Sequence, residues 1–296
     1  MKYASILLLG LVVILAFSGP VAAHRFGPNG EGNPWFMPAI PDQAIARYDG
    51  DLSDWAWFPT RWTFGPNDFI SMGNFNTSEQ AVPKDDWDFI LYGPAWIPAT
   101  NQVTWAVSVN DNIMYTPFTD LQASYQMDGG QFGTDADHGG EAKAESQEYQ
   151  QNYWTIAQGG SIGLFGPQEL FWEFEAPYAF YGMKIEPNGS YTAEIAVTLW
   201  DHLDPGGVGQ SKLHVLEAGQ IIGFTVELYD MDSDTEQEFP DAEFDFGNVA
   251  IGGEVIGDYL VLPVEETLAA LEEEGRPLPS AVEASTWGRI KSTFTK

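Results

Sequence analysis

Aspartates at ligand spacing are the residues whose chemistry is easiest to foresee in this sequence. One group recurs at every second position after an apolar stretch, and a second lies in a glycine-rich segment. They are Asp230, Asp232 and Asp234, and Asp128, Asp135 and Asp137. Calcium takes about six to eight oxygen ligands, which carboxylate-rich loops supply. Both groups are therefore candidate calcium sites, although neither has the spacing of an EF-hand loop. The alternative for each group is a solvated, charged loop.

Aromatic side chains form the second kind of candidate site. The chain has 11 Trp, 12 Tyr and 19 Phe, and a flat ring can support the apolar face of a sugar while polar groups bind its hydroxyls. Five rings in or beside expected loops are candidates for such a platform: Trp87, Trp96, Phe118, Trp154 and Trp172. The alternative for each ring is packing in the core.

Catalytic chemistry has little support in the sequence. With 43 acidic residues, pairs of carboxylates at the separation used by glycosidases arise by chance. The four histidines are scattered along the chain, and there is no nucleophile elbow, phosphate-binding loop or dinucleotide fingerprint. We therefore expect a protein without catalytic activity.

Charge and cysteine content exclude several further classes of protein. The formal net charge of −31 repels nucleic acids and anionic lipid surfaces. Solubility or residence in a salty medium is the simpler explanation for most of this acidity. The chain has no cysteine, which rules out disulfides and thiolate metal sites.

The first residues have the features of an export signal. Lys2 precedes an apolar run from Ile6 to Phe17, and small residues follow at 21–23, which predicts a signal peptide over residues 1–23. No later stretch reaches the ~20 apolar residues of a membrane span. We expect a secreted, periplasmic or cell-surface protein that does not insert into a membrane.

Alternating apolar residues predict most of the remaining chain to be β-strands. Ile222 to Tyr229 has the period-two pattern of a half-buried strand, as do Val103 to Val109 and Ala193 to Leu199. Asn188-Gly189 is a hairpin signal before the last of these. Further strands are expected at 69–75, 88–92, 149–156 and 287–294, with two more within 170–186.

The other segments are expected to be loops, apart from one helix. Residues 24–44 read as a loose N-terminal arm, and 128–148 as a long surface loop because they have few apolar residues and several glycines. Val264 to Glu274 is expected to be helical between Pro263 and Gly275. The glutamates at its C-terminal end predict a solvated, marginal helix.

These elements predict an all-β fold, an antiparallel β-sandwich of jelly-roll or immunoglobulin-like type with one short C-terminal helix. The expected domain covers residues 45–296, with the helical insertion at about 263–275.

The order of motifs resembles the family 9 carbohydrate-binding modules and the wider group of DOMON-like sandwiches. The resemblance covers about residues 45–294 and rests on the order of several short motifs. They are Asp49-Gly50-Asp51-Leu52-Ser53-Asp54-Trp55, Val103 to Asp111, Met127-Asp128, Tyr191 to Trp200, Ile221 to Asp232 and Trp287-Gly288.

The resemblance implies a β-sandwich, structural calcium and binding of glycan chain ends between aromatic rings. Carried over by position, the first stacking tryptophan of the family falls near Phe118, its sugar-contacting glutamate near Ser124 and its arginine near Gln150. The sequence departs from the family at all three positions. It also has no tryptophan in 241–263, where the second stacking ring would lie.

The sequence therefore predicts an exported, non-catalytic module that binds poly- or oligosaccharide through loop aromatics, with calcium as its cofactor. The predicted sugar-binding residues are Phe118, Gln150, Trp154, Trp172 and Trp87. If the protein is associated with catalysis, we expect an accessory role in carbohydrate catabolism. Two alternatives stay open: a haem-binding electron-transfer module on the same sandwich, and an adhesion protein without a small ligand. No haem is expected, because no pair of Met and His stands out as axial ligands. The sequence leaves the oligomeric state open.

Overall fold

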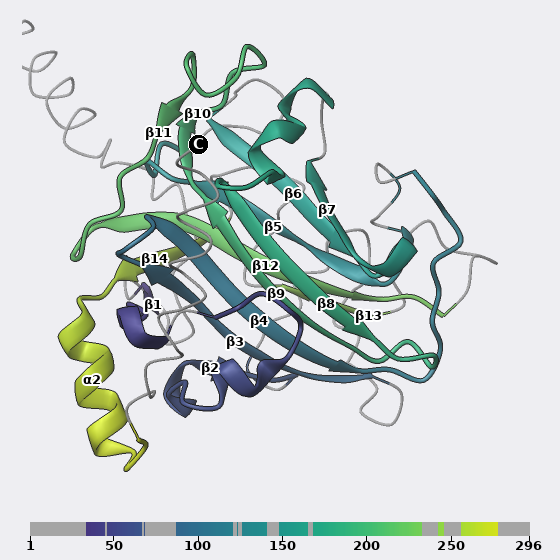
Figure 1. Cartoon of the computed structure of the whole chain (residues 1–296), viewed down its shortest axis with the longest axis horizontal. Coiled ribbons are helices and arrows are strands. Elements are labelled where there is room, and N and C mark those ends of the chain that lie inside the picture. The colour runs from purple at the N-terminus through teal and green to yellow at the C-terminus, as the bar shows by residue number, and fades with distance from the viewer. Residues whose placement is uncertain are drawn as a thin grey trace, which may run out of the picture.

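In the part of the chain that the structure describes, two large β-sheets face each other and a short α-helix lies at one side (Figure 1). The computed structural model describes residues 34–44, 46–66, 68, 87–120, 123, 126–140, 148–164, 168–232, 242–245 and 256–277. The strands and the helix in this part of the chain are β1 (Trp35–Met37), β2 (Thr63–Phe64), β3 (Asp88–Ile97), β4 (Gln102–Asn110), β5 (Gly129–Asp135), β6 (Tyr149–Thr155), β7 (Ser161–Leu164), β8 (Ala179–Ile185), β9 (Tyr191–Thr198), β10 (Trp200–His202), β11 (Lys212–Leu213), β12 (Ile221–Asp230), β13 (Ala242–Asp245), β14 (Gly257–Val261) and α2 (Val264–Glu273).

The two sheets are mostly antiparallel, as expected for a sandwich. The larger sheet has the order β1-β14-β12-β5-β6-β7, with β13 also paired to β12, and the smaller has the order β2-β3-β4-β9-β8. Strand β1 pairs in parallel with β14, and β10 and β11 form a separate hairpin. The predicted all-β sandwich with one C-terminal helix is confirmed. Among the described residues, no helix has the length and apolarity needed to cross a bilayer.

The core between the sheets is built from the apolar sets that alternation predicted. Trp105 of β4 packs against Phe132 of β5, with ring centroids 4.8 Å apart, and against Phe224 of β12 at 5.7 Å. Trp154 of β6 completes this aromatic group at 6.0 Å from Trp105. All four rings are fully buried, so the hydrophobic effect and ring packing hold the two sheets together.

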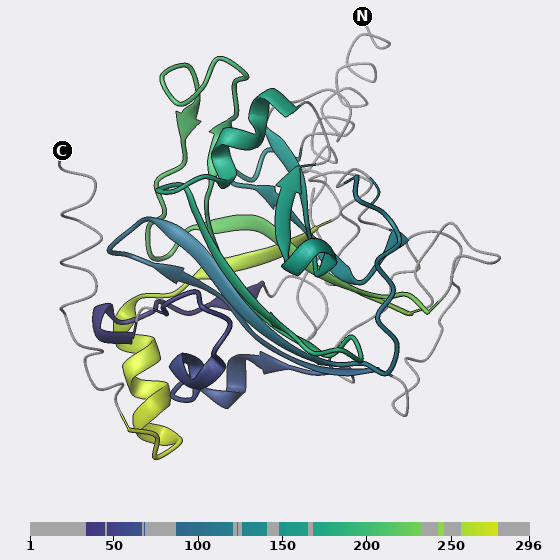
Figure 2. The same cartoon turned by 45° about the vertical axis from the view of Figure 1, so that its right-hand side comes forward.

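The outer face of the smaller sheet carries a second, smaller core. Trp55, Trp57 and Phe58 lie on this face together with Leu271 of α2, and Figure 2 shows α2 beside the N-terminal segment. Glu274 at the end of α2 accepts hydrogen bonds from the backbone and side chains of Thr60 and Arg61. The prediction of a solvated helix holds for Glu272 and Glu273, which are exposed. It is wrong for the opposite face of the helix, where Ala270 and Leu271 are buried.

Three further expectations about elements are wrong. The start of the stretch 170–186 is a 3₁₀ helix, Gln168–Phe174, and only its second part is a strand, β8. The described part of the expected loose arm contributes β1, whose backbone pairs with β14. Strand β12 is not half-buried, because Thr225, Glu227 and Tyr229 on its polar face are as buried as its apolar residues.

The expected surface loop over 128–148 contains strand β5, which lies between β12 and β6 in the middle of the larger sheet. A Cβ atom at Gly130 would overlap the Glu227 carbonyl oxygen and the Trp154 ring. The glycines that suggested a loop are therefore needed where an indole ring and a neighbouring backbone approach β5 closely. The predicted strands at 69–75 and 287–294 and the predicted signal peptide lie outside the described residues.

Gly130→Ala should destabilise the fold by about 1–3 kcal/mol, because the added methyl group has no room and the strands must shift. Urea unfolding measures the effect. Gly209→Ala is the matched control, since open space surrounds that glycine and its replacement should be close to neutral. Equal stability of the two variants would contradict the packing described for β5.

A buried carboxylate ties the N-terminal segment to the smaller sheet. Glu194 of β9 is fully buried and accepts hydrogen bonds from Trp55 Nε1 at 2.9 Å, Gly50 N at 2.7 Å and Asp49 N at 2.9 Å. Burial raises its pKa to about 7, against the opposing effect of these three N–H donors.

Because the pKa of Glu194 is above its ordinary value of 4.5, the folded chain holds this proton more tightly than the unfolded chain. Its contribution to stability is therefore full below pH 4.5 and is lost as the pH rises to about 7. The free energy of unfolding of the wild type minus that of Glu194→Gln should fall by about 3 kcal/mol over this range. Glu186→Gln, at an exposed position, should show no such trend. A flat difference for Glu194→Gln would contradict the raised pKa.

Candidate functional site

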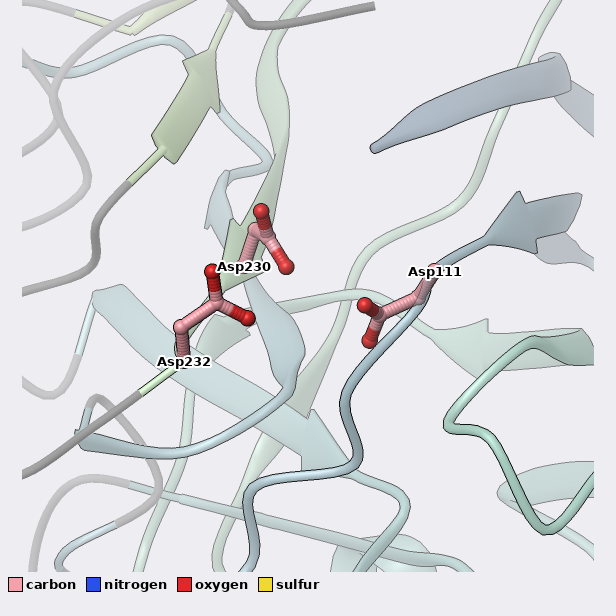
Figure 3. Close-up of side chains that lie close together, drawn as sticks. All are labelled: Asp111, Asp230 and Asp232. Atoms are coloured by element: carbon pink, nitrogen blue, oxygen red, sulfur yellow. The ribbon is translucent and has the colours of Figure 1, made fainter. Parts of the chain in front are cut away.

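Three carboxylates from distant parts of the chain meet at one end of the sandwich. Asp230 ends β12, Asp232 follows it, and Asp111 follows β4 of the other sheet. Figure 3 shows the carboxylate of Asp111 facing those of Asp230 and Asp232 across a shared space. One oxygen from each lies within 4.8 Å of the others. Asp111 and Asp230 are buried, so these like charges are close together in a region with little water.

Asp128 lies beside this group and fixes the backbone around it. Its carboxylate accepts hydrogen bonds from Tyr115 N at 2.6 Å and Met231 N at 3.1 Å. Burial raises its pKa to about 8, and the charges of Asp111 and Asp232 add to this rise, whereas the two N–H donors oppose it. Asp128 therefore joins the segment after β4 to the end of β12.

The geometry of the group fits a hard cation. Calcium to oxygen distances are about 2.3–2.6 Å, so two ligands of one ion lie at most about 5 Å apart. The separation of 4.8 Å or less among Asp111, Asp230 and Asp232 meets this limit. Hard cations such as calcium prefer oxygen donors such as carboxylates, whereas softer metals prefer sulfur donors.

The structure does not bring Asp128, Asp135 and Asp137 together into one predicted calcium site. Asp128 precedes β5 and Asp135 is its last residue, and seven residues of strand place them about 23 Å apart. Asp135 accepts hydrogen bonds from Gly139 N and Gly140 N, and Asp137 lies at the same end, where burial and Asp135 raise its pKa. The predicted site made of Asp128, Asp135 and Asp137 is therefore wrong. Asp234 lies outside the described residues.

Asp111 was missed by the sequence analysis. It stands alone in the sequence at the end of a predicted strand, without another carboxylate at ligand spacing. The end of β4 lies opposite the end of β12, and this position could have identified Asp111. It can be recognised only when one knows how the two sheets face each other.

A layer of polar side chains lies on the face of the larger sheet that points away from the core. Register places Glu227 beside Gln131, and Gln131 beside Tyr153. Thr225 and Gln151 flank the same glycine of β5. The members of this layer, which we call the polar layer, are Gln131, Gln151, Tyr153, Thr225, Glu227 and Tyr229. All are buried.

Hydrogen bonds connect part of the polar layer and leave two acceptors available. Gln151 Nε2 donates to Gln131 Oε1 at 2.7 Å, and the Tyr229 hydroxyl donates to Glu227 Oε2 at 2.7 Å. Within the described residues, Gln151 Oε1 and Thr225 Oγ1 are buried without a hydrogen-bond partner. Such groups are costly unless something satisfies them, so they mark a place where a polar ligand would gain hydrogen bonds.

The segment 111–120 connects the carboxylate group at Asp111 to the polar layer. It begins at Asp111, is held by Asp128 through Tyr115, and reaches the end of β6, where Gln158 Nε2 donates to the Thr119 carbonyl. The charge of Asp120 contributes to the raised pKa of Tyr153, although burial is the larger cause. The segment therefore passes beside the polar layer. It carries the exposed side chains of Ile113, Met114 and Phe118.

The structure places the predicted sugar-binding residues in different environments. Trp87 and Trp154 are in the core, so the predictions for these two rings are wrong. Gln150 is buried on the core side of β6 and accepts a hydrogen bond from Thr134. Trp172 packs edge-on against Trp200 at 5.1 Å. Only Phe118 among the five is exposed, at 37%.

Trp96 and Ser124 were the remaining residues considered for sugar binding. Trp96 is also buried, and its indole N–H donates to the Leu262 carbonyl. Ser124 lies outside the described residues.

Met127 and His214, a methionine and a histidine that a haem-binding sandwich could use as axial ligands, lie near opposite ends of β5. Met127 precedes Asp128 at one end of β5. His214 lies 2.5 Å from Asp201, whose charge acts on Asp137 at the other end. This methionine and this histidine are therefore too far apart to bind one haem iron.

Comparison with known proteins identifies similar structures but no family. No family model and no curated protein matches the chain. A family 9 carbohydrate-binding module from Caldicellulosiruptor kristjanssonii in complex with cellotriose is 13% identical with a TM-score of 0.48, over 77% of this chain and 93% of the other. The glucose complex of a family 9 module from that organism is 12% identical, with a TM-score of 0.48, over 77% and 94%.

Proposed function

We propose that this protein is an exported, non-catalytic carbohydrate-binding module. It binds the end of an oligo- or polysaccharide at the polar layer and its margin, and calcium stabilises the adjoining segment 111–120. The observation that carries this proposal is the hydrogen-bonded pair Gln131 and Gln151 with an unsatisfied acceptor. Segment 111–120, which is bonded to the end of β6 through Thr119, carries the exposed ring of Phe118.

Sugar hydroxyls both donate and accept hydrogen bonds, and a glutamine side chain offers both functions as well. Gln151 Oε1 and Thr225 Oγ1 can each accept a hydrogen bond from a sugar hydroxyl. Because the polar layer is buried, the sugar reaches it from the margin, where segment 111–120 carries Phe118. The Phe118 ring then covers the apolar face of the sugar.

Calcium acts on the base of the same segment. Asp111 begins it, and Asp230 and Asp232 lie on the opposite sheet, so an ion bound to all three joins the two sheets at this end. Bound calcium would also remove the repulsion among three clustered carboxylates. Segment 111–120 would then be ordered before the sugar binds, which lowers the entropy cost of binding.

Replacing Gln131 or Phe118 by Ala should weaken binding of the glycan that the wild-type protein retains. Loss of one hydrogen bond or one ring contact corresponds to about tenfold in affinity. A glycan array with cello-, xylo- and manno-oligosaccharides identifies the ligand, and isothermal titration measures each variant. Tyr181→Ala, a ring exposed by 40% on β8, is the control and should bind normally. If the wild type retains no glycan, or if all three variants lose affinity equally, the proposal is wrong.

Calcium should raise the thermal stability of the wild type, because binding to the folded state alone adds about 2.7 kcal/mol at one hundred times the dissociation constant. Asp111→Asn should abolish this gain and, in the presence of a chelator, should be at least as stable as the wild type because one like charge is gone. Asp137→Asn, at the other end of β5, should keep the gain. Melting temperatures measured with chelator and with millimolar calcium test both statements. An equal gain in Asp111→Asn would place the ion elsewhere.

A further inference from the structure

A cleft of about 420 Å³ lies on the outer face of the smaller sheet, on the opposite side of the sandwich from the polar layer. Its floor is formed by Ser108 and Asn110 of β4 and by Thr192 of β9, and Ser108 and Thr192 are directly paired. The backbone turn at 50–52 and Lys184 lie next to each other in its wall. Glu186 also lines the cleft. This volume is at the small end of the range of about 300–1,000 Å³ for ligand sites.

The wall of the cleft at Gly50 is fixed by buried hydrogen bonds. Thr192 Oγ1 donates to the Gly50 carbonyl at 2.6 Å, and Gly50 N donates to the buried carboxylate of Glu194. Gly50 has φ +77°, and a Cβ atom there would lie 2.7 Å from the backbone of Met183 and Lys184. Only glycine fits this position, so the turn and β8 are held at a constant separation.

The chemistry of the cleft favours a small polyhydroxylated ligand. Its lining offers the hydroxyls of Ser108 and Thr192, the amide of Asn110 and the ammonium of Lys184. Lys184 Nζ lies 3.2 Å from Asp51, and both side chains are more than half exposed, so both can also reach a ligand. The one aromatic residue in the lining, Tyr191, is buried and its hydroxyl donates to the Gly129 carbonyl, so no ring is available for stacking.

The charges in the lining of the cleft favour an uncharged ligand over an anionic one. Two carboxylates, Asp51 and Glu186, stand against one ammonium group, Lys184, in a protein of net charge −31. Phosphate and polyanionic ligands are therefore disfavoured. An uncharged sugar can accept a hydrogen bond from Lys184 and donate to both carboxylates and to Asn110.

We propose that this cleft is a second saccharide-binding site, which takes one or two uncharged sugar units by hydrogen bonding without ring stacking. The site does not depend on the polar layer or on calcium, because no residue is shared. A protein with sites on both faces of the sandwich can bind two glycan chains, or two parts of one chain, at the same time.

Amide chemical shifts of the full chain, labelled with ¹⁵N and titrated with glucose, mannose, galactose, N-acetylglucosamine and cellobiose, test this proposal. At least one sugar should shift the amides of Gly50, Asn110 and Thr192. Ser108→Trp fills the cleft and should abolish these shifts. Lys184→Met should weaken binding about tenfold, the effect of one charge-assisted hydrogen bond.

Lys212→Met is the matched control, because Lys212 forms a similar surface ion pair with Asp201 at 2.9 Å far from the cleft, and it should bind as the wild type does. Gln131→Ala separates the two sites, since it should leave the shifts at Gly50, Asn110 and Thr192 intact. The proposal is overturned if none of the five sugars shifts these amides, or if a folded Ser108→Trp variant gives the same shifts as the wild type.

Discussion

The close packing of Trp154 against Gly130 is the constraint on which the candidate site depends. Strand β5 lies between β12 and β6, and the indole ring of Trp154 occupies the space that a side chain at Gly130 would fill. The same ring closes the core against Trp105 and Phe132. A side chain at Gly130 would push β5 away from Trp154 and shift it within the larger sheet. Gln131, on its outer face, and Asp128, at its start, would then lack their positions.

The same arrangement explains why polar and acidic groups concentrate at one end of the larger sheet. Strands β5 and β12 are antiparallel, with Gly129 opposite Tyr229, so the residue before β5 and the residues after β12 lie together. Strand β4 of the facing sheet ends at the same edge and brings Asp111 there. Four carboxylates are thus gathered by backbone geometry. Their mutual repulsion in a buried setting is the physical reason to propose a cation between them.

The smaller sheet uses a buried charge for a different purpose. Glu194 binds three N–H donors of the segment 49–55, and buried carboxylates with several donors hold a backbone more tightly than apolar contacts do, since the geometry is directional. The consequence is that one end of this face is covered by a second hydrophobic core and α2. The other end keeps a fixed, polar cleft. The two proposed sites therefore depend on different sheets.

The sequence by itself determined the class of fold and many of the elements. Alternation located β4, β9 and β12, and end signals located α2, because these patterns arise from the local geometry of each element. Tertiary structure decided which residues meet. A glycine-rich stretch became the central strand β5 because a tryptophan from the next strand filled its empty face. Asp111 joined Asp230 through the register of two facing sheets, while Asp135 was carried to the far end. Trp87 and Trp154 entered the core, since burial of a ring depends on what packs over it and not on its neighbours in sequence.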